Sequence, residues 1–215
     1  MDMVVHEFTV EEGAFLVRLA RKSVEEYLAR GVEISPPADI PEKFRVKRGV
    51  FVTINKLRFE GGFRHKVLRG CIGYPYPTHP LVEALIDAAI SAATSDPRFR
   101  PLKFEELREV VFEVSVLTEP ELIRVPSPSM YPQMVRIGLD GLIVKKGWFT
   151  GLLLPQVAVE WNWDAEEFLS NCCIKAGLPP DAWLDRDIQI YRFQAEIFEE
   201  LEPQGEVIKK ELHWG

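Results

Sequence analysis

Residues 48–72 read RGVFVTINKLRFEGGFRHKVLRGCI and fall into two strand-like halves. Its two halves, residues 48–59 and 64–72, are rich in Val, Ile, Phe and Thr, which are residue types enriched in β-strands. Glu60, Gly61 and Gly62 lie between the halves, and glycine readily adopts the positive backbone angles of a tight turn. The stretch therefore predicts a β-hairpin.

Apolar residues recur at helical spacing in three other segments. The first helix is expected over residues 11–30 and ends at Gly31, before the Pro-rich connector of residues 35–41. The second is expected to begin at Thr78, as its N-terminal cap, and to run to about Thr94. The third is expected from its cap Asp164 to Ala176, where Gly177 follows.

The remaining strand-like segments are residues 110–117, residues 188–198 and a second hairpin of residues 142–146 and 148–154 that turns at Gly147. Hairpins dominate and no strand-helix-strand unit repeats. The predicted fold class is therefore α+β, a mostly antiparallel sheet with packed helices.

The composition is that of a globular protein of one large domain or two closely packed lobes, since the chain has 215 residues, 47% hydrophobic and 27% charged. An odd number of cysteines, three, argues against a disulfide framework and predicts a cytoplasmic location. Residues 1–10 lack the pattern of a signal peptide, and the apolar run of residues 81–93 is interrupted by Glu83 and Asp87. No membrane role is expected.

Only three Asn residues occur in the sequence beside many Glu, Lys and Arg, and this compositional bias is typical of heat-tolerant proteins.

Charge is distributed unevenly along the chain. The whole sequence carries a net charge of −7, but residues 43–69 hold nine Lys and Arg against the single acid Glu60, a net charge of +8. These cations either discourage pairing at a strand edge or attract an anionic ligand or partner. An acidic chain makes a nucleic-acid partner unfavourable.

The segment VLRGCIG, residues 67–73, carries the clearest chemical signal. In a regular strand Arg69 and Cys71 share one face, and His65 joins them if the strand extends that far. A cation beside a thiol favours the reactive thiolate, and Gly70 and Gly73 allow a backbone or a ligand to come close. The alternative interpretation is structural, with Cys71 as a small buried residue and Arg69 as an ion-pair partner.

Three further charged residues have both a structural and a functional interpretation. Asp96 and Arg98 either pin a turn by pairing with each other or line a site. Lys175 either complements a helix dipole or binds a ligand. Adjacent Cys172 and Cys173 lack the spacing of a metal or redox pair, and the scattered histidines form no ligand motif, so no metal site is expected. Nucleotide-binding loops and the serine-hydrolase elbow are missing from the sequence.

A set of short motifs resembles one family. In order they are LRGCIG at residues 68–73, DPRF at 96–99, VSVLT at 114–118, GLDGL at 138–142, LPQV at 154–157 and KAG at 175–177. Together they are similar to the AMMECR domain family over residues 11–198. The resemblance implies one AMMECR-like domain over residues 1–215, a compact mixed fold with a larger and a smaller lobe. It implies no established reaction and no catalytic assignment, and it implies an association with Memo-like or radical S-adenosylmethionine proteins.

Three functional hypotheses follow, and none of them identifies a cofactor. The first is an enzyme or small-ligand binder with a pocket around Leu68–Gly73. In it Cys71 is the nucleophile, Arg69 the activator and anion anchor, and His65 the base. The other pocket residues would be Gly70, Gly73, Asp96, Arg98 and Lys175.

The second hypothesis is a non-enzymatic adaptor that binds a protein partner through the basic hairpin and exposed apolar surface. Trp148, Phe149, Trp161 and Trp163 are its candidate contacts. The third and least favoured is RNA binding through residues 43–69, because the chain lacks an RNA-binding signature.

Overall fold

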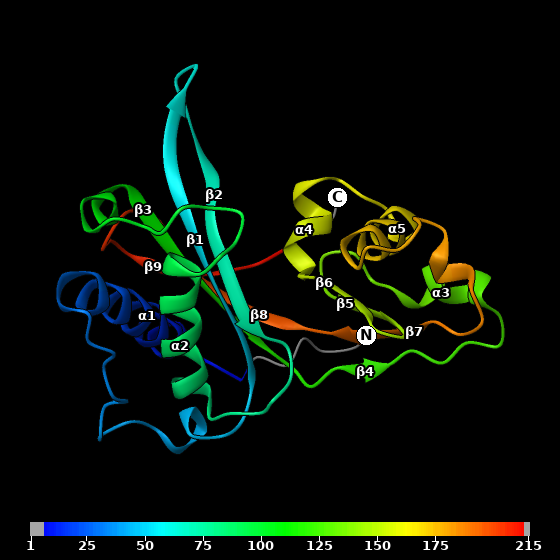
Figure 1. Ribbon diagram of the computed structural model, residues 1–215, viewed down its shortest axis with the longest axis horizontal. Coiled ribbons are helices and arrows are strands. Elements are labelled where there is room, and N and C mark those ends of the chain that lie inside the picture. Colours follow the sequence, from blue (N-terminus) through cyan, green and yellow to red (C-terminus); the bar gives the residue numbers. More distant parts are fainter. Residues whose placement is uncertain (1–6, 213–215) are drawn as a thin grey trace. The chain divides into compact units, whose positions relative to one another are not determined.

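A computed structural model describes residues 7–212 of the chain, which divide into two compact units (Figure 1). The larger unit comprises residues 7–117 and 196–210, and the smaller unit comprises residues 118–195 and 211–212. The two units match the larger and smaller lobes that the resemblance implies. That they act as a single domain stays a prediction. Residues 1–6, most of the segment examined for a signal peptide, lie outside the described part.

The larger unit is built on a five-stranded sheet in the order β2-β1-β3-β8-β9. Its strands are β1 (Gly49–Glu60), β2 (Phe63–Tyr74), β3 (Val110–Leu117), β8 (Ala195–Glu200) and β9 (Val207–Lys210). The pairings of β1 with β2 and β3, and of β8 with β9, are antiparallel. The helices are α1 (Val10–Arg30) and α2 (Leu81–Thr94), with the short 3-10 turns η1 (Glu42–Phe44) and η2 (Phe104–Glu109).

The predicted hairpin of residues 48–72 is confirmed, and both turn glycines adopt positive φ angles, 59° at Gly61 and 81° at Gly62. The β1–β3 pairing ends at Lys56. The last residues of β1 and the facing residues of β2 therefore continue past β3 as a two-stranded ribbon, which projects in Figure 1 as the cyan arm. We call residues 57–66 the hairpin tip.

The core of the larger unit lies between the sheet and its helices. Val50, Val52 and Ile54 alternate along β1 and are fully buried, as the two-residue period of a strand predicts. Small residues of α2 such as Ala88 and Ala92 let that helix pack closely.

Helix ends follow the predictions at α1 but not at the start of α2. Thr9 and Glu12 form a capping box at α1, which ends at Gly31 with φ 69°. The predicted cap at Thr78 is wrong, because α2 begins at Leu81 after Pro80 and has no side-chain cap. The Thr78 hydroxyl lies 2.9 Å from His79 Nδ1 instead.

The smaller unit has a four-stranded sheet in the order β4-β7-β5-β6. Its strands are β4 (Glu121–Leu122), β5 (Gly141–Lys146), β6 (Phe149–Leu153) and β7 (Gln189–Phe193), and all three pairings are antiparallel. Its helical segments are η3 (Pro128–Met130), α3 (Tyr131–Met134), α4 (Pro155–Glu160), α5 (Ala165–Lys175) and η4 (Ala182–Leu184). The second hairpin and the Asp164 cap of α5 are confirmed, and Gly147 and Gly177 have positive φ angles.

The late strand predicted over residues 188–198 is two strands, β7 and β8, which belong to different sheets. The break falls at Gln194, whose N–H donates to Thr118 Oγ1 and whose carbonyl accepts the Thr118 N–H, each at 2.9 Å. Hydrophobic alternation predicted an extended chain but could not show that the chain changes sheets there.

Two largely antiparallel sheets with packed helices confirm the α+β class. Across residues 7–212, no helix combines the length and the apolar composition needed to span a bilayer.

Candidate functional site

The motif of residues 68–73 contains an irregularity in the β1–β2 ladder. Gly70 pairs with Ile54, but Leu68 pairs with Asn55, so Arg69 is an extra residue without a partner in β1. Such a β-bulge interrupts the alternation of side chains along a strand. The prediction that Arg69 and Cys71 lie together on one face is therefore wrong, because the two side chains diverge.

The Arg69 guanidinium is bound by η2 and by the loop that follows α2. Its Nε and Nη2 donate to the two carboxylate oxygens of Glu106, each at 3.1 Å, and Nη1 donates to the Arg100 carbonyl at 2.9 Å. Burial would raise the pKa of Glu106, but the hydrogen bonds from Arg69 outweigh it and lower that pKa. Arg69 is the ion-pair partner of the structural interpretation.

The motif glycines allow close approach of protein backbone. A Cβ atom on Gly70 would lie 2.1 Å from the Ala92 carbonyl oxygen of α2, and one on Gly73 would lie 2.3 Å from the Val50 carbonyl oxygen. Both distances are too short for any side chain. Gly70 therefore lets the last turn of α2 contact β2.

The Cys71 thiol points to Thr53 on the neighbouring strand, whose hydroxyl donates to the sulfur at 3.3 Å. Burial raises the pKa of the Cys71 thiol, and Glu113 and Asp96 add to that effect. Thr53 and Arg98 act in the opposite direction but do not cancel it. The thiol is therefore protonated near neutral pH, and a protonated thiol is a poor nucleophile.

Asp96 and Arg98 close the outer edge of the sheet at Cys71. The Cys71 N–H donates to Asp96 Oδ2 at 2.9 Å, and Arg98 Nη2 donates to the Cys71 carbonyl at 3.3 Å. Arg98 also holds both Asp96 oxygens, at 3.0 and 2.7 Å. Burial would raise the pKa of Asp96, but the bonds from Arg98 and from the Cys71 N–H lower it to about 2. The pair pins the turn, as its structural interpretation predicted.

His65 and Lys175 do not join this group. His65 pairs across the hairpin with Arg58, and its Nε2 lies 3.6 Å from a Glu60 oxygen. Six residues of strand, at about 3.3 Å each, separate His65 from Cys71 by about 20 Å. Lys175 is exposed in the last turn of α5, in the smaller unit.

Sequence reasoning missed the partners of the motif. Glu106 and Thr53 hold Arg69 and Cys71 from distant parts of the chain, and no local pattern marks either residue. Tyr74 was also missed. Its hydroxyl donates to Asp87 on α2, which raises the pKa of Tyr74 to about 12.

Most of the cations in residues 43–69 are paired within the larger unit. Seven of the nine lie within 4.0 Å of a carboxylate oxygen: Lys43 with Glu12, Arg45 with Glu42, Arg48 with Glu7, Lys56 with Glu109, Arg64 with Glu202, Lys66 with Glu199, and Arg69 with Glu106. Internal carboxylates therefore offset most of the local charge that suggested an anionic ligand.

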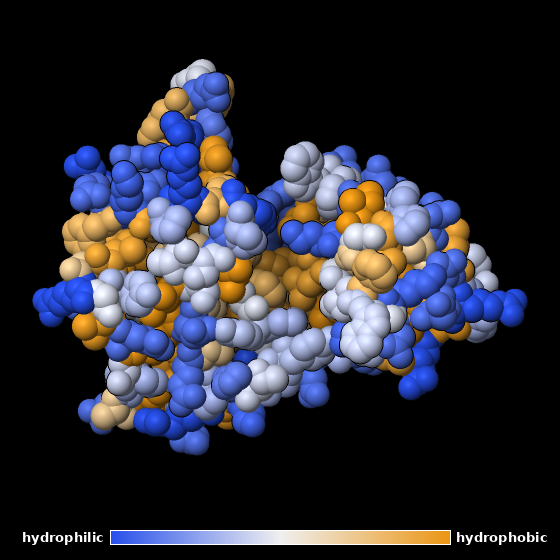
Figure 2. Space-filling model, viewed as in Figure 1, coloured by the Kyte–Doolittle hydropathy of each residue, from blue (hydrophilic) through white to orange (hydrophobic). Residues whose placement is uncertain are grey.

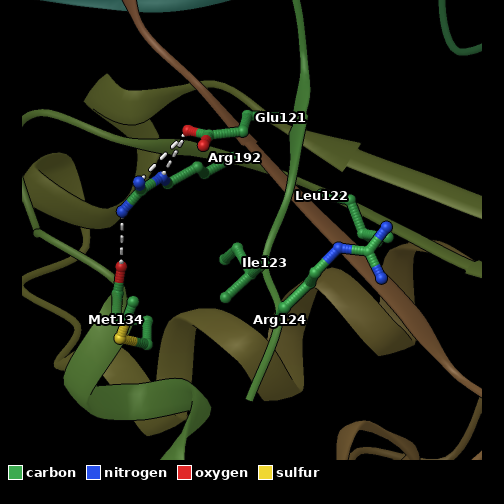
Figure 3. A pocket seen from close by; sticks show the side chains of 6 residues that line it. All are labelled: Glu121, Leu122, Ile123, Arg124, Met134 and Arg192. Carbon is green, nitrogen blue, oxygen red and sulfur yellow. Dashed lines mark hydrogen bonds and ion pairs between the residues drawn. The ribbon is translucent and has the colours of Figure 1, made fainter.

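The smaller unit contains a pocket of about 480 Å³ beside β4 (Figure 3). It is lined by Glu121, Leu122, Ile123, Arg124, Met134 and Arg192. Arg192 donates to Glu121 at 3.1 and 3.2 Å and to the Met134 carbonyl at 3.5 Å, so its guanidinium is held against the wall. The sequence singled out no residue of this lining.

Among residues 7–212, no three His, Cys, Asp or Glu side chains are grouped so that they could hold a metal ion. Cys172 and Cys173 are fully buried, and the Cys172 thiol lies 3.6 Å from the carbonyl oxygens of Leu142 and Gly151. These two cysteines therefore belong to the packing of α5 on its sheet.

Comparison with known proteins agrees with the motif order. The model of the AMMECR1 family matches residues 17–198. A protein of Pyrococcus furiosus is 59% identical over 207 residues, which cover 94% of each chain, and one of Methanothermobacter thermautotrophicus is 57% identical over 190 residues, 88% of this chain and 95% of the other. The crystal structure of a protein from Pyrococcus horikoshii, 57% identical, superposes with a TM-score of 0.88 over 93% of this chain and 97% of that one.

These relatives come from thermophilic archaea, which agrees with the low Asn content. The family match covers most of the chain, and the relatives share more than half of its residues. The chain therefore belongs to the AMMECR1 family.

Proposed function

We propose that the protein is a non-enzymatic adaptor that binds a protein partner through the hairpin tip, residues 57–66. One observation carries the proposal. Phe59 and Phe63 are each 79% exposed, at the end of a ribbon that projects beyond its sheet. Figure 2 shows apolar side chains beside charged ones at this projecting end.

The exposure of these two rings contrasts with other aromatic residues of the same unit. Phe44, Phe112 and Phe198 are at most 1% exposed. Burying a phenylalanine side chain stabilises a protein by about 1.5–3 kcal/mol, so two rings left in water are available to stabilise a complex instead. Aromatic side chains are also the usual energetic anchors of protein interfaces.

The charge of the tip indicates the chemistry of the partner. Arg58 directly precedes Phe59 in the sequence, and no ion pair or hydrogen bond from the side chains of residues 7–212 engages its guanidinium. The fitting partner surface has apolar pockets for the rings and a carboxylate for Arg58.

The smaller unit offers further exposed aromatic residues that the sequence singled out. Trp148 is fully exposed, Phe149 is 53% exposed and Trp161 is 68% exposed. Trp161 stacks on Trp163 with ring centroids 6.0 Å apart. These rings also support an adaptor role, because burying them in a complex would be favourable for the same reason.

The geometry supports the enzyme hypothesis less well. The Cys71 thiol is protonated, the Arg69 guanidinium is held by Glu106, and His65 is too distant to be a base for Cys71. Catalytic roles for these residues stay predictions, as do ligand-binding roles for Gly70, Gly73, Asp96, Arg98 and Lys175. RNA binding loses its main support because seven of nine cations are paired. The cytoplasmic location also stays a prediction.

Site-specific photocrosslinking tests the adaptor function. Benzoylphenylalanine placed at Phe63 is expected to crosslink one partner in extracts of cells that carry the natural gene. The same group at Val32, which is 52% exposed outside the hairpin, serves as the matched control. Excess unlabelled protein should compete, and the double variant Phe59→Ser/Phe63→Ser should not.

Purified Memo-like and radical S-adenosylmethionine proteins are the first candidates for the partner. Equal crosslinking from positions 63 and 32, or equal competition by the double variant, would show that the tip is not the binding surface.

A further inference from the structure

We infer that the outer edge of β2 from Arg64 to Leu68 accepts an extended, acidic segment of the partner protein as an added β-strand. The inference rests on the adaptor function and deepens it, because it specifies how the partner is held. It uses the backbone of β2, whereas the adaptor function uses the rings of the tip.

The register of the hairpin shows which backbone groups face outward. In a hairpin with a two-residue turn, the residues that flank the turn form a hydrogen-bonded pair, here Glu60 and Phe63. Such pairs alternate with pairs whose N–H and C=O groups point away from the partner strand. Because β2 is the edge strand, the N–H and C=O groups of Arg64, Lys66 and Leu68 point out of the sheet.

The motif half of β2 confirms this assignment independently. After the extra residue Arg69, the outward position falls on Cys71, and the Cys71 N–H and C=O do bind groups outside the sheet, on Asp96 and Arg98. Side chains therefore close the edge at Cys71. Within residues 7–212, no hydrogen bond reaches the outward backbone groups of Arg64, Lys66 or Leu68.

The side chains along this open edge suit an added strand. Phe63 and Val67 share one face and are 79% and 44% exposed, so an incoming strand can cover them. Arg64 and Lys66 lie on the other face and are bound to Glu202 and Glu199, which holds their side chains in place.

Charge decides between two possible occupants of the edge. A second copy paired through the same edge would set the ion-paired Arg64 and Lys66 against the same ion pairs and would leave both Arg58 side chains without a carboxylate. Arg64 and Lys66 are already bound to Glu202 and Glu199, so Arg58 is the cation of the ribbon whose side chain no carboxylate of residues 7–212 pairs, and it lies on the same face as Phe63 and Val67. An acidic segment of a different protein therefore fits the edge, and self-pairing does not.

A proline substitution separates the backbone edge from the side chains. Lys66→Pro removes one outward N–H and leaves the β1–β2 ladder intact, because that N–H takes no part in it. Lys66→Thr loses the same ion pair to Glu199 but keeps the N–H, and it is the matched control. The probe is a 12-residue peptide selected from a random phage library on the wild-type protein, with its affinity measured by fluorescence anisotropy. Thermal unfolding verifies that both variants are folded.

Three results would support the inference together. The selected peptides should be acidic with alternating apolar residues, Lys66→Pro should weaken their binding at least about tenfold, and Lys66→Thr should change it less than about threefold. Equal affinities of the two variants, or a selection that yields no binding peptide, would overturn the strand addition.

The adaptor function and the strand addition can be tested separately. If the crosslink at Phe63 persists in the Lys66→Pro variant, the tip binds its partner without strand addition. If peptides bind through the edge but no partner crosslinks at Phe63, the edge is a binding surface and the proposed role of the tip is wrong.

Discussion

Strand β2 passes through two environments, and they differ in how much of the strand is covered by other parts of the larger unit. From Gly70 to Gly73 the strand is buried or half-buried: α2 lies against Gly70, and Asp96 and Arg98 satisfy the backbone groups of the half-buried Cys71. From Phe63 to Leu68 the side chains and the outer backbone edge face solvent, apart from the ion pairs of Arg64 and Lys66. The residues with the most suggestive chemistry thus contact other parts of the larger unit, while the residues of the tip are exposed.

The enclosed half is expected to be most sensitive at Gly70. Gly70→Ala places a Cβ atom 2.1 Å from the Ala92 carbonyl oxygen, so β2 and α2 must separate. Forcing extra atoms into a packed region typically costs 1–3 kcal/mol and occasionally more, and we expect a loss of about 3 kcal/mol because the obstacle is backbone. Urea unfolding measures this loss.

Gly61→Ala in the exposed half is the control for that substitution. Nothing lies within 4 Å of a Cβ atom at Gly61, but its φ of 59° strains a side chain by about 1–2 kcal/mol. The difference between the variants isolates the contact with α2. If Gly70→Ala costs no more than Gly61→Ala, β2 and α2 are not packed as closely as we describe.

The closure of the edge at Cys71 should depend on pH through Asp96. The pKa of Asp96 is about 2 against an ordinary value of 3.8, so the ionised form stabilises the folded state. This stabilisation, about 2 kcal/mol, is complete above about pH 5 and is lost as the pH falls towards 2. The difference in unfolding free energy between wild type and Asp96→Asn should therefore shrink over that range. Asp39→Asn, at an exposed carboxylate, is the control variant.

Alkylation of Cys71 tests whether the motif is structural. Because burial raises the pKa of the thiol, we expect Cys71 to react with iodoacetamide more slowly in the folded than in the unfolded protein at pH 7.5. Mass spectrometry follows each cysteine, with the buried Cys172 and Cys173 as internal references. Fast reaction with an apparent pKa below about 8.5 would return Cys71 to the enzyme hypothesis.

Periodicity and turn chemistry were sufficient to predict the elements of both halves. The hairpin, its Gly61–Gly62 turn and the capped helices at Thr9 and Asp164 depend on contacts within a few residues. The bulge at Arg69 has no such local signal, because Glu106, 37 residues later, binds the side chain that leaves the ladder. The extra residue in the bulge turns the Arg69 side chain away from Cys71. The strand was therefore predicted correctly, but the prediction that Arg69 and Cys71 share one face of it was wrong.

Substitutions in the exposed half of β2 and its tip should have the smallest effect on the free energy of unfolding. Phe59→Ser/Phe63→Ser removes two rings that are each 79% exposed, so we expect the unfolding free energy to change by less than about 0.5 kcal/mol. Phe112→Ala, at a fully buried ring, should cost about 3–5 kcal/mol in the same assay. A double variant as stable as wild type that no longer competes for the partner would assign the rings to binding. A loss of several kcal/mol would mean that the tip is packed in solution, and the contrast between the two halves of β2 would then fail.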